Sequence, residues 1–134
     1  MQKRGQVSLE YLMLVAFVLI ILLPAIVLGY DALAKNRDAI AVRQAEQAAA
    51  SIVQEAEIVY YLGPPSKSTV RVNIPGQVFD AVVHDHEVVY RIRTQNGIDD
   101  VAIFSRVNLT GNVPETQGEH LLTVQATGTS VEIS

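Results

Sequence analysis

The sequence of 134 residues contains no cysteine. This absence excludes a disulfide scaffold, a cysteine-based zinc site and a thiol nucleophile. It does not place the protein in the cytoplasm, because an external protein can be held together by assembly instead of by disulfides.

Basic residues are also few. Ten lysines and arginines stand against fourteen aspartates and glutamates, which gives a net charge of −4. The basic residues form no patch and do not alternate with aromatic residues, and a nucleic-acid-binding surface normally shows such a footprint. We therefore expect no nucleic acid among the partners.

Charge is missing altogether from the twenty residues between Tyr11 and Tyr30. A helix of this length spans about 30 Å, the thickness of the hydrocarbon core of a bilayer. Glu10 directly precedes this run, although a carboxylate at the bilayer centre costs roughly 2.5–3.5 kcal/mol on insertion scales and less near the edge. The run predicts a membrane-spanning helix, and Glu10 calls for an explanation.

Proline and glycine are absent from residues 31–62, which are rich in alanine, glutamine and glutamate. This composition favours a helix, and the sequence Gly63-Pro64-Pro65 ends it. Gly29 weakens the helix and Pro24 should kink it, so we predict one long, bent helix over residues 6–62.

An apolar stripe, built mostly of alanine, follows one side of this helix after residue 31, and polar residues follow the other side. The stripe can pack against the protein's own β domain or between copies of the chain. The stripe consists of Ala41, Ala45, Ala48, Ala49, Ile52, Ala56 and Val59, and the polar side carries Arg43, Glu46, Gln47, Gln54 and Glu57.

After Gly63 the sequence changes to short β-branched runs separated by turn residues. Alternation in TVRVNI and the hairpin signal at Gln95–Gly97 predict five or six strands in an antiparallel meander. The domain of residues 64–134 is so small that its core is marginal, and we expect it to lean on the helix or on neighbouring copies. The predicted fold is α+β: a long hydrophobic and amphipathic N-terminal helix followed by a small β head.

Candidate catalytic and metal-binding residues are few. His84-Asp85-His86 offers two imidazoles on one face and no third ligand, and a polar hairpin turn is the favoured interpretation. His120 stands alone, and Asp99-Asp100 is interpreted as a solvated loop. The sequence shows no nucleophile elbow, phosphate-binding glycine loop or paired carboxylates, so we predict no enzyme, no cofactor and no metal site.

The triplet Asn108-Leu109-Thr110 is an N-glycosylation sequon. It is expected in a loop before Gly111, and it becomes meaningful only if this part of the chain is exported. Asn108 is then the predicted acceptor.

The opening residues contain the pattern Gln-x-Ser-x-Glu-x-x-x-Leu, formed by Gln6, Ser8, Glu10 and Leu14 behind a short basic leader. This pattern resembles the class III signal peptide of archaeal type IV pilin-like proteins. The resemblance covers about the first thirty residues, and the remainder matches such pilins only in its layout of a helical stalk and a β head.

The resemblance implies that a prepilin peptidase cleaves between Gly5 and Gln6 and removes residues 1–5. Glu10 then becomes the fifth residue, where type IV pilins keep a glutamate that neutralises the N-terminal amine of a neighbouring subunit. Each charge would be costly alone in an apolar filament core, and each offsets the other. The implied assembly residues are Gln6, Ser8 and Glu10.

The implied partners are copies of the chain in a helical filament, the peptidase, an assembly ATPase and a membrane platform protein. The precursor would lie in the cytoplasmic membrane, and the mature protein would form an extracellular filament on the cell surface that serves adhesion.

Two alternatives remain open. The chain could be a monomeric membrane-anchored module, or a minor pilin-like component, that binds a ligand. It could also be a secreted soluble domain starting at Lys35, because Ala32-Leu33-Ala34 resembles a signal-peptidase site. Against this second alternative, the apolar run is longer than a secretory h-region, and the helical pattern continues through the site. The positive-inside rule does not decide orientation, since Lys35 and Arg37 balance Lys3 and Arg4.

Overall fold

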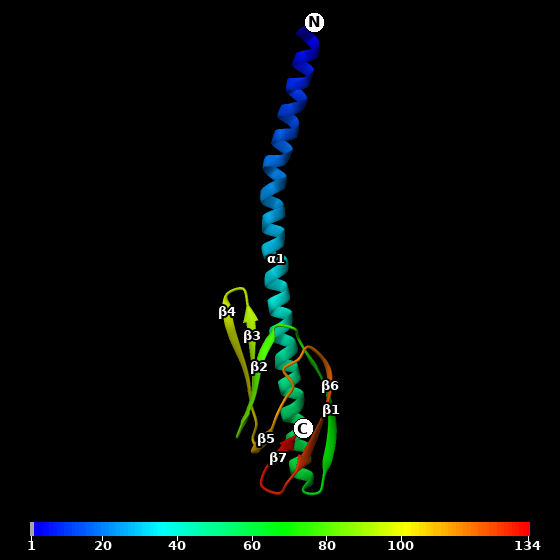
Figure 1. Ribbon diagram of the computed structural model, residues 1–134, viewed down its shortest axis with the longest axis vertical. Helices are drawn as coiled ribbons and strands as arrows, with labels where there is room; N and C mark the ends of the chain where they lie inside the picture. Colours follow the sequence, from blue (N-terminus) through cyan, green and yellow to red (C-terminus); the bar gives the residue numbers. More distant parts are fainter. Residues whose placement is uncertain (1) are drawn as a thin grey trace. The chain divides into compact units, whose positions relative to one another are not determined.

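The computed structural model describes residues 2–134, with side chains from Gly5 onward (Figure 1). The chain forms two compact units, Met1–Asn36 and Arg37–Ser134, each of which is described by itself. The elements are α1 (Gln2–Leu62), β1 (Lys67–Ile74), β2 (Val78–His84), β3 (Glu87–Thr94), β4 (Gly97–Phe104), β5 (Leu109–Gly111), β6 (Gly118–Ala126) and β7 (Val131–Ile133). A long N-terminal helix followed by antiparallel sheets confirms the predicted α+β class.

Helix α1 continues through Pro24 and ends at Leu62, as predicted. It begins at Gln2, four residues before the predicted start, because the leader residues Gln2, Lys3 and Arg4 are good helix formers and no breaker stops them. The predicted bend at Pro24 stays a prediction. At the other end Gly63 has a φ of 78°, the left-handed conformation that closes a helix and that glycine adopts without steric cost.

The alanine-rich stripe of α1 is buried within the second unit. All seven predicted positions are buried, and Val53 joins them at 6% exposure. The stripe belongs to one hydrophobic core together with buried residues from both sheets. Of the two uses left open for the stripe, packing against the protein's own β domain is therefore the one observed. On the predicted polar side, Arg43, Glu46, Gln47 and Gln54 are exposed and Glu57 is half-buried.

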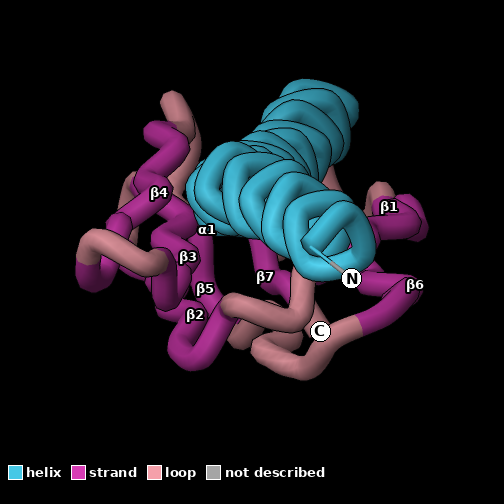
Figure 2. Tube along the Cα trace, turned by 90° about the horizontal axis from the view of Figure 1, so that it is seen from above, coloured by secondary structure: helices cyan, strands magenta, loops and turns pink. Residues whose placement is uncertain are grey.

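The strands form two sheets, so the single predicted meander is wrong in its topology. Strands β2, β3 and β4 do form an antiparallel meander, while the second sheet has the order β1-β6-β7-β5 and pairs β5 with β7 in parallel. The two sheets flank α1, with β1 and β6 on one side and β2 to β4 on the other (Figure 2). One sheet would leave part of the wide helical stripe uncovered, and two sheets bury it.

The two short hairpins of the meander follow their turn signals. Thr94 pairs with Gly97 across Gln95-Asn96, and His84 pairs with Glu87 across Asp85-His86. The final hairpin of β6 and β7 is confirmed as well. Asp99 and Asp100 lie within β4 and not in the solvated loop that the sequence suggested, because the two-residue turn at Gln95-Asn96 returns the chain directly into a strand.

Two carboxylates of α1 hold connections of the second unit in place. Asp38 accepts hydrogen bonds from the Gln77 side-chain amide and from the backbone N–H of Gln95, each at 2.9 Å. Glu57 accepts a bond of 3.0 Å from the backbone N–H of Arg106. These bonds fix where β4 starts and ends along the helix.

Tyr90 is the largest fully buried side chain. Its hydroxyl has no hydrogen-bond partner among the described residues. Burial raises the pKa of this phenol well above its ordinary value, because the charged form would be desolvated.

Candidate functional site

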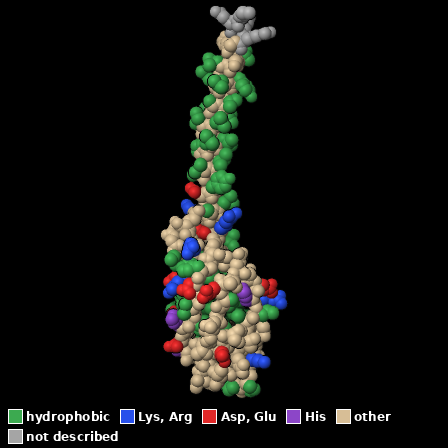
Figure 3. Space-filling model, in the orientation of Figure 1, with side chains coloured by type: hydrophobic (Ala, Val, Ile, Leu, Met, Phe, Trp, Pro, Cys, Tyr) green, Lys and Arg blue, Asp and Glu red, His purple; other side chains and the backbone are tan. Residues whose placement is uncertain are grey.

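The described part of the first unit carries mostly apolar side chains, and these are exposed. Every residue from Gly5 to Leu33 is exposed, and hydrophobic side chains cover this part of α1 (Figure 3). By length and composition, α1 contains a stretch long and apolar enough to cross a membrane. Water does not solvate so much contiguous apolar surface without cost, so lipid or other protein must cover it.

The residues of the opening motif occupy defined positions on α1. Gln6 and Glu10 are four residues apart and share one helix face, whereas Ser8 lies about 200° around the axis from Gln6. Glu10 is exposed and makes no ion pair with the side chains of residues 5–134. Its carboxylate therefore stands at the edge of an uncharged surface without an ion-pair partner among residues 5–134.

The expected cleavage point lies in an unobstructed part of the helix. A Cβ atom placed on Gly5 would meet no atom within 4 Å, and Gln6 is exposed. The side chains of residues 1–4, the rest of the expected leader, lie outside the described residues. Glycine is the weakest helix former after proline, so Gly5 lowers the local stability of the helix beside this bond.

The glycosylation sequon lies where a loop meets an edge strand: Asn108 is in the loop, as predicted, whereas Leu109 and Thr110 belong to β5, which pairs with β7. Leu109 is buried, and the Thr110 hydroxyl donates to the Val131 carbonyl at 3.3 Å. Asn108 is half-buried, and its Oδ1 has no hydrogen-bond partner in the described part of the chain. Modification of Asn108 remains a prediction.

The histidines lie in or beside strands of the second unit. His84 ends β2, and Asp85 and His86 form the turn that leads to β3, which confirms the hairpin interpretation. His120 lies in β6, and its Nε2 is 2.8 Å from the Thr116 carbonyl. Over residues 5–134, no group of three histidine, aspartate or glutamate side chains is arranged to hold a metal ion.

Sequence reasoning missed the roles of three residues. Asp38 and Glu57 anchor connections 57 and 49 residues away, and polar residues on a helix give no signal of such distant partners. Gly111 has a φ of 107°, and a Cβ there would overlap the carbonyl oxygen of Ile133. Only glycine allows β5 to approach β7 so closely.

Comparison with known proteins identifies the N-terminal motif. Residues 3–28 match the family model for the class III signal peptide. No curated protein and no solved structure matches the chain. The matched range contains the Gly5–Gln6 bond, Glu10 and most of the uncharged run. This chain therefore carries a class III signal peptide, the type IV pilin-like signal, at the start of a long apolar helix.

Proposed function

We propose that this protein is a pilin, the structural subunit of an extracellular, archaeal type IV pilus-like filament. A prepilin peptidase cleaves the precursor between Gly5 and Gln6 while the apolar part of α1 lies in the cytoplasmic membrane. An assembly ATPase and a membrane platform protein then transfer the mature subunit into the filament. The role is structural and not enzymatic, and the filament serves adhesion.

One observation carries this proposal: a class III signal peptide opens a helix whose apolar side chains are uncovered from Gly5 to Leu33. Burying one large apolar side chain contributes about 1.5–3 kcal/mol. The twenty uncharged residues from Tyr11 to Tyr30 thus provide a large driving force for leaving water, in lipid first and then against neighbouring copies.

Glu10 fits the same proposal. Cleavage creates a new ammonium at Gln6, and an isolated charge is very costly in an apolar surrounding. The Glu10 carboxylate of a neighbouring copy offsets that charge and sets the register between subunits.

A second candidate is a secreted soluble domain starting at Lys35. One observation favours it: the compact second unit begins at Arg37, so cleavage after Ala34 would release that unit whole. The signal-peptide match speaks against it, because the class III signal belongs to precursors that keep their apolar helix.

The mature N-terminus distinguishes the two. Mass spectrometry of the mature protein should find Gln6 as the first residue, and shearing of intact cells should release the protein as a polymer. A first residue of Lys35 would replace the pilin proposal with the secreted one. A Gln6 start without polymer would instead support a membrane-anchored monomer or a minor pilin-like component.

A further inference from the structure

Two strands of the second unit have an edge that pairs with no other strand among residues 2–134. β1 ends the four-stranded sheet and β4 ends the three-stranded sheet (Figure 2). The other two ends, β5 and β2, contact each other, and the Leu109 N–H donates to the Asp85 carbonyl at 2.7 Å. An unpaired edge presents backbone N–H and C=O groups that favour pairing with another strand.

The hydrogen-bond pattern shows which backbone groups are free. The Ala126 N–H donates to the Ser66 carbonyl, and bonding alternates along an antiparallel strand, so every second residue of β1 turns away from β6. In β4 the Ser105 N–H donates to the His86 carbonyl, so by the same alternation every second residue of β4 turns away from β3. All eight edge residues have exposed side chains: Lys67, Thr69, Arg71 and Asn73 on β1, and Ile98, Asp100, Ala102 and Phe104 on β4.

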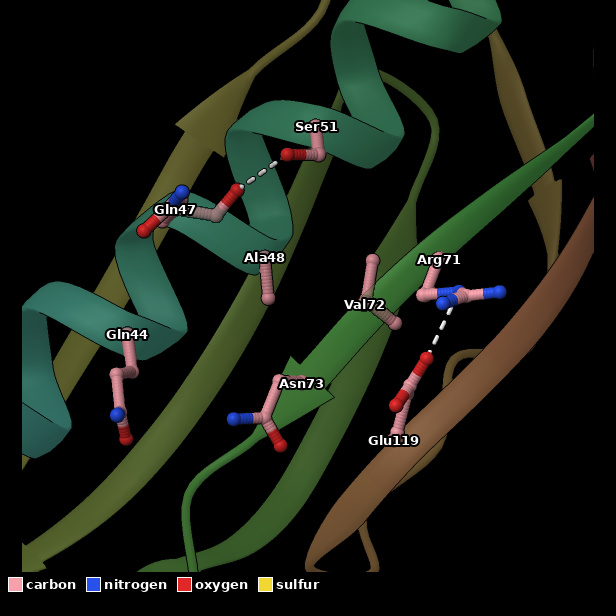
Figure 4. A pocket seen from close by; sticks show the side chains of 8 residues that line it. All are labelled: Gln44, Gln47, Ala48, Ser51, Arg71, Val72, Asn73 and Glu119. Atoms are coloured by element: carbon pink, nitrogen blue, oxygen red, sulfur yellow. Dashed lines mark hydrogen bonds and ion pairs between the residues drawn. The ribbon is translucent and has the colours of Figure 1, made fainter.

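Helix α1 does not cover the edge of β1. A cleft of about 520 Å³ separates the two elements, lined by Gln44, Gln47 and Ser51 on the helix and by Arg71 and Asn73 on the strand (Figure 4). The edge is therefore accessible to a strand from outside.

The two free strands run in opposite directions along α1. β1 starts just after the end of the helix at Leu62, and its last residue, Ile74, lines a cleft with Arg37 and Ile40. β4 instead starts beside Asp38, which binds the preceding turn, and ends beside Glu57, which binds Arg106. When two copies have parallel helices, β1 of one and β4 of the other are antiparallel, the more stable arrangement for paired strands.

The charges on the two edges are opposite. β1 carries Lys67 and Arg71 and no acid, whereas β4 carries Asp99 and Asp100 and no base. Pairing β1 with β1, or β4 with β4, places like charges together and is destabilising, whereas β1 with β4 joins opposite charges. Such a contact joins two different surfaces, so it continues from copy to copy and does not stop at a dimer unless rotation closes a ring.

Existing ion pairs do not block this contact. Arg71 Nε lies 2.7 Å from Glu119, and Arg91 Nε lies 3.8 Å from Asp100, but both pairs are largely exposed. Exposed pairs of this kind contribute about 0–1 kcal/mol, so their exchange for contacts between copies costs little.

We propose that β1 of one copy pairs antiparallel with β4 of the next copy, with Arg71 opposite Asp100. This inference rests on the proposed filament and names the surface by which its subunits join outside the apolar helix. In this register all eight residues of each strand are paired. Four pairs would exchange backbone hydrogen bonds: Lys67 with Phe104, Thr69 with Ala102, Arg71 with Asp100, and Asn73 with Ile98.

The absence of native cysteine allows a direct test by disulfide formation. In the proposed register the Cα atoms of Thr69 and Ala102 of adjacent copies lie about 5.5 Å apart, within the range for a disulfide. Within one chain the two strands belong to different sheets on opposite sides of α1, so a bond between them must join two copies (Figure 2). Filaments of the full-length chain carrying Thr69→Cys and Ala102→Cys are oxidised mildly and separated on a non-reducing gel.

We expect the double variant to give a ladder of disulfide-linked oligomers on the gel. Thr69→Cys and Ala102→Cys on separate co-expressed chains should give dimers only, and either variant alone should give monomers. The matched control, Thr69→Cys with Ile98→Cys, places the sulfurs about four residues out of register, roughly 13 Å apart, and should give no ladder.

Charged side chains on edge strands can also prevent pairing between copies. The cross-linking result distinguishes that role from the proposed strand pairing. Filaments that give no ladder, or an equal ladder from the control, would overturn the strand pairing and leave the pilin proposal intact. Dimers from Thr69→Cys alone would indicate pairing of like edges and overturn it as well. If the wild-type chain forms no filament, both proposals fail together. If the double variant alone does not assemble, the co-expressed single variants test the same pairing: dimers support it, and monomers overturn it.

Discussion

Replacing Glu10 with alanine removes the carboxylate that stands at the edge of the uncharged run. In the assembled filament this leaves the Gln6 ammonium of a neighbouring copy buried without a partner. Breaking a buried ion pair in this way costs about 3–5 kcal/mol. Since about 1.4 kcal/mol corresponds to a factor of ten, each subunit contact weakens by roughly two to three and a half orders of magnitude. We expect Glu10→Ala to abolish filaments.

The position of Gln6 on the same helix face as Glu10 offers a competing explanation. The amine could pair with Glu10 of its own chain, because residues four apart on a helix are neighbours. An exposed pair of this kind contributes only about 0.3–0.5 kcal/mol, so its loss would leave filaments nearly unchanged. The size of the effect therefore separates pairing between copies from pairing within one chain.

The assay expresses Glu10→Ala as the only copy and compares sheared filaments with those of wild type. Glu46→Ala is the matched control, since Glu46 is exposed on the part of α1 that belongs to the second unit. The mature N-terminus is measured in parallel, because cleavage occurs at a different bond and should be normal. Abundant filaments of Glu10→Ala would refute the assembly role of this carboxylate.

Four further predictions follow from the positions of three residues, Gly5, Tyr90 and Asn108. Gly5→Leu should leave an unprocessed precursor, because the proposed cleavage occurs directly after this residue. A Cβ atom here would meet no atom within 4 Å, so we expect the helix to tolerate the substitution. Tyr90→Phe should raise the free energy of unfolding by about 1 kcal/mol, because it removes a buried hydroxyl without a partner. In wild type, stability should also fall as pH rises above about 10, since the unfolded phenol loses its proton there and the folded one, with its raised pKa, keeps it. In a host with N-glycosylation, Asn108 should carry a glycan, detected by intact mass and absent from Asn108→Gln.

Each of these predictions has a control within the chain. Gly29→Leu changes a glycine that is equally unobstructed and should mature normally, so equal maturation of both variants would contradict the role of Gly5. Tyr61→Phe alters an exposed phenol and should leave denaturant unfolding unchanged. A loss of stability in Tyr90→Phe would show that the hydroxyl has a partner. An intact mass equal to that of the unmodified polypeptide would contradict the predicted glycan on Asn108 and leave the pilin proposal unaffected.

The sequence predicted those features of the fold that depend on residues close together in the chain. The alanine stripe from Ala41 to Val59 follows from helical periodicity, and every predicted position is buried. The end of α1 follows from the left-handed conformation that Gly63 adopts. The hairpin across Gln95-Asn96 follows from its turn residues, because a two-residue loop allows only one register.

The sheet order could not be predicted in the same way. β1 pairs with β6, with Lys67 opposite Gln125, and no turn signal connects two strands so far apart in the sequence. The parallel pairing of β5 and β7 depends on the close approach that Gly111 permits, and a lone glycine is equally typical of an ordinary turn. The charges of Asp99 and Asp100 favour a loop, yet charged residues are also common on an edge strand such as the one they occupy.

The use of the alanine stripe within the chain restricts how copies can join. Eight helical side chains complete the core of the second unit, which the 71 residues from 64 to 134 could not form well alone. Since that face of α1 is occupied, the surfaces proposed for contacts between subunits are the uncovered apolar residues before Asn36 and the free edges of β1 and β4. The two surfaces are separable by experiment. Glu10→Ala acts on the first and should prevent assembly, whereas Arg71→Asp acts on the second and should weaken contacts that a compensating Asp100→Arg restores. If Glu10→Ala abolishes filaments but Asp100→Arg does not restore the contacts weakened by Arg71→Asp, assembly is assigned to the apolar helix alone.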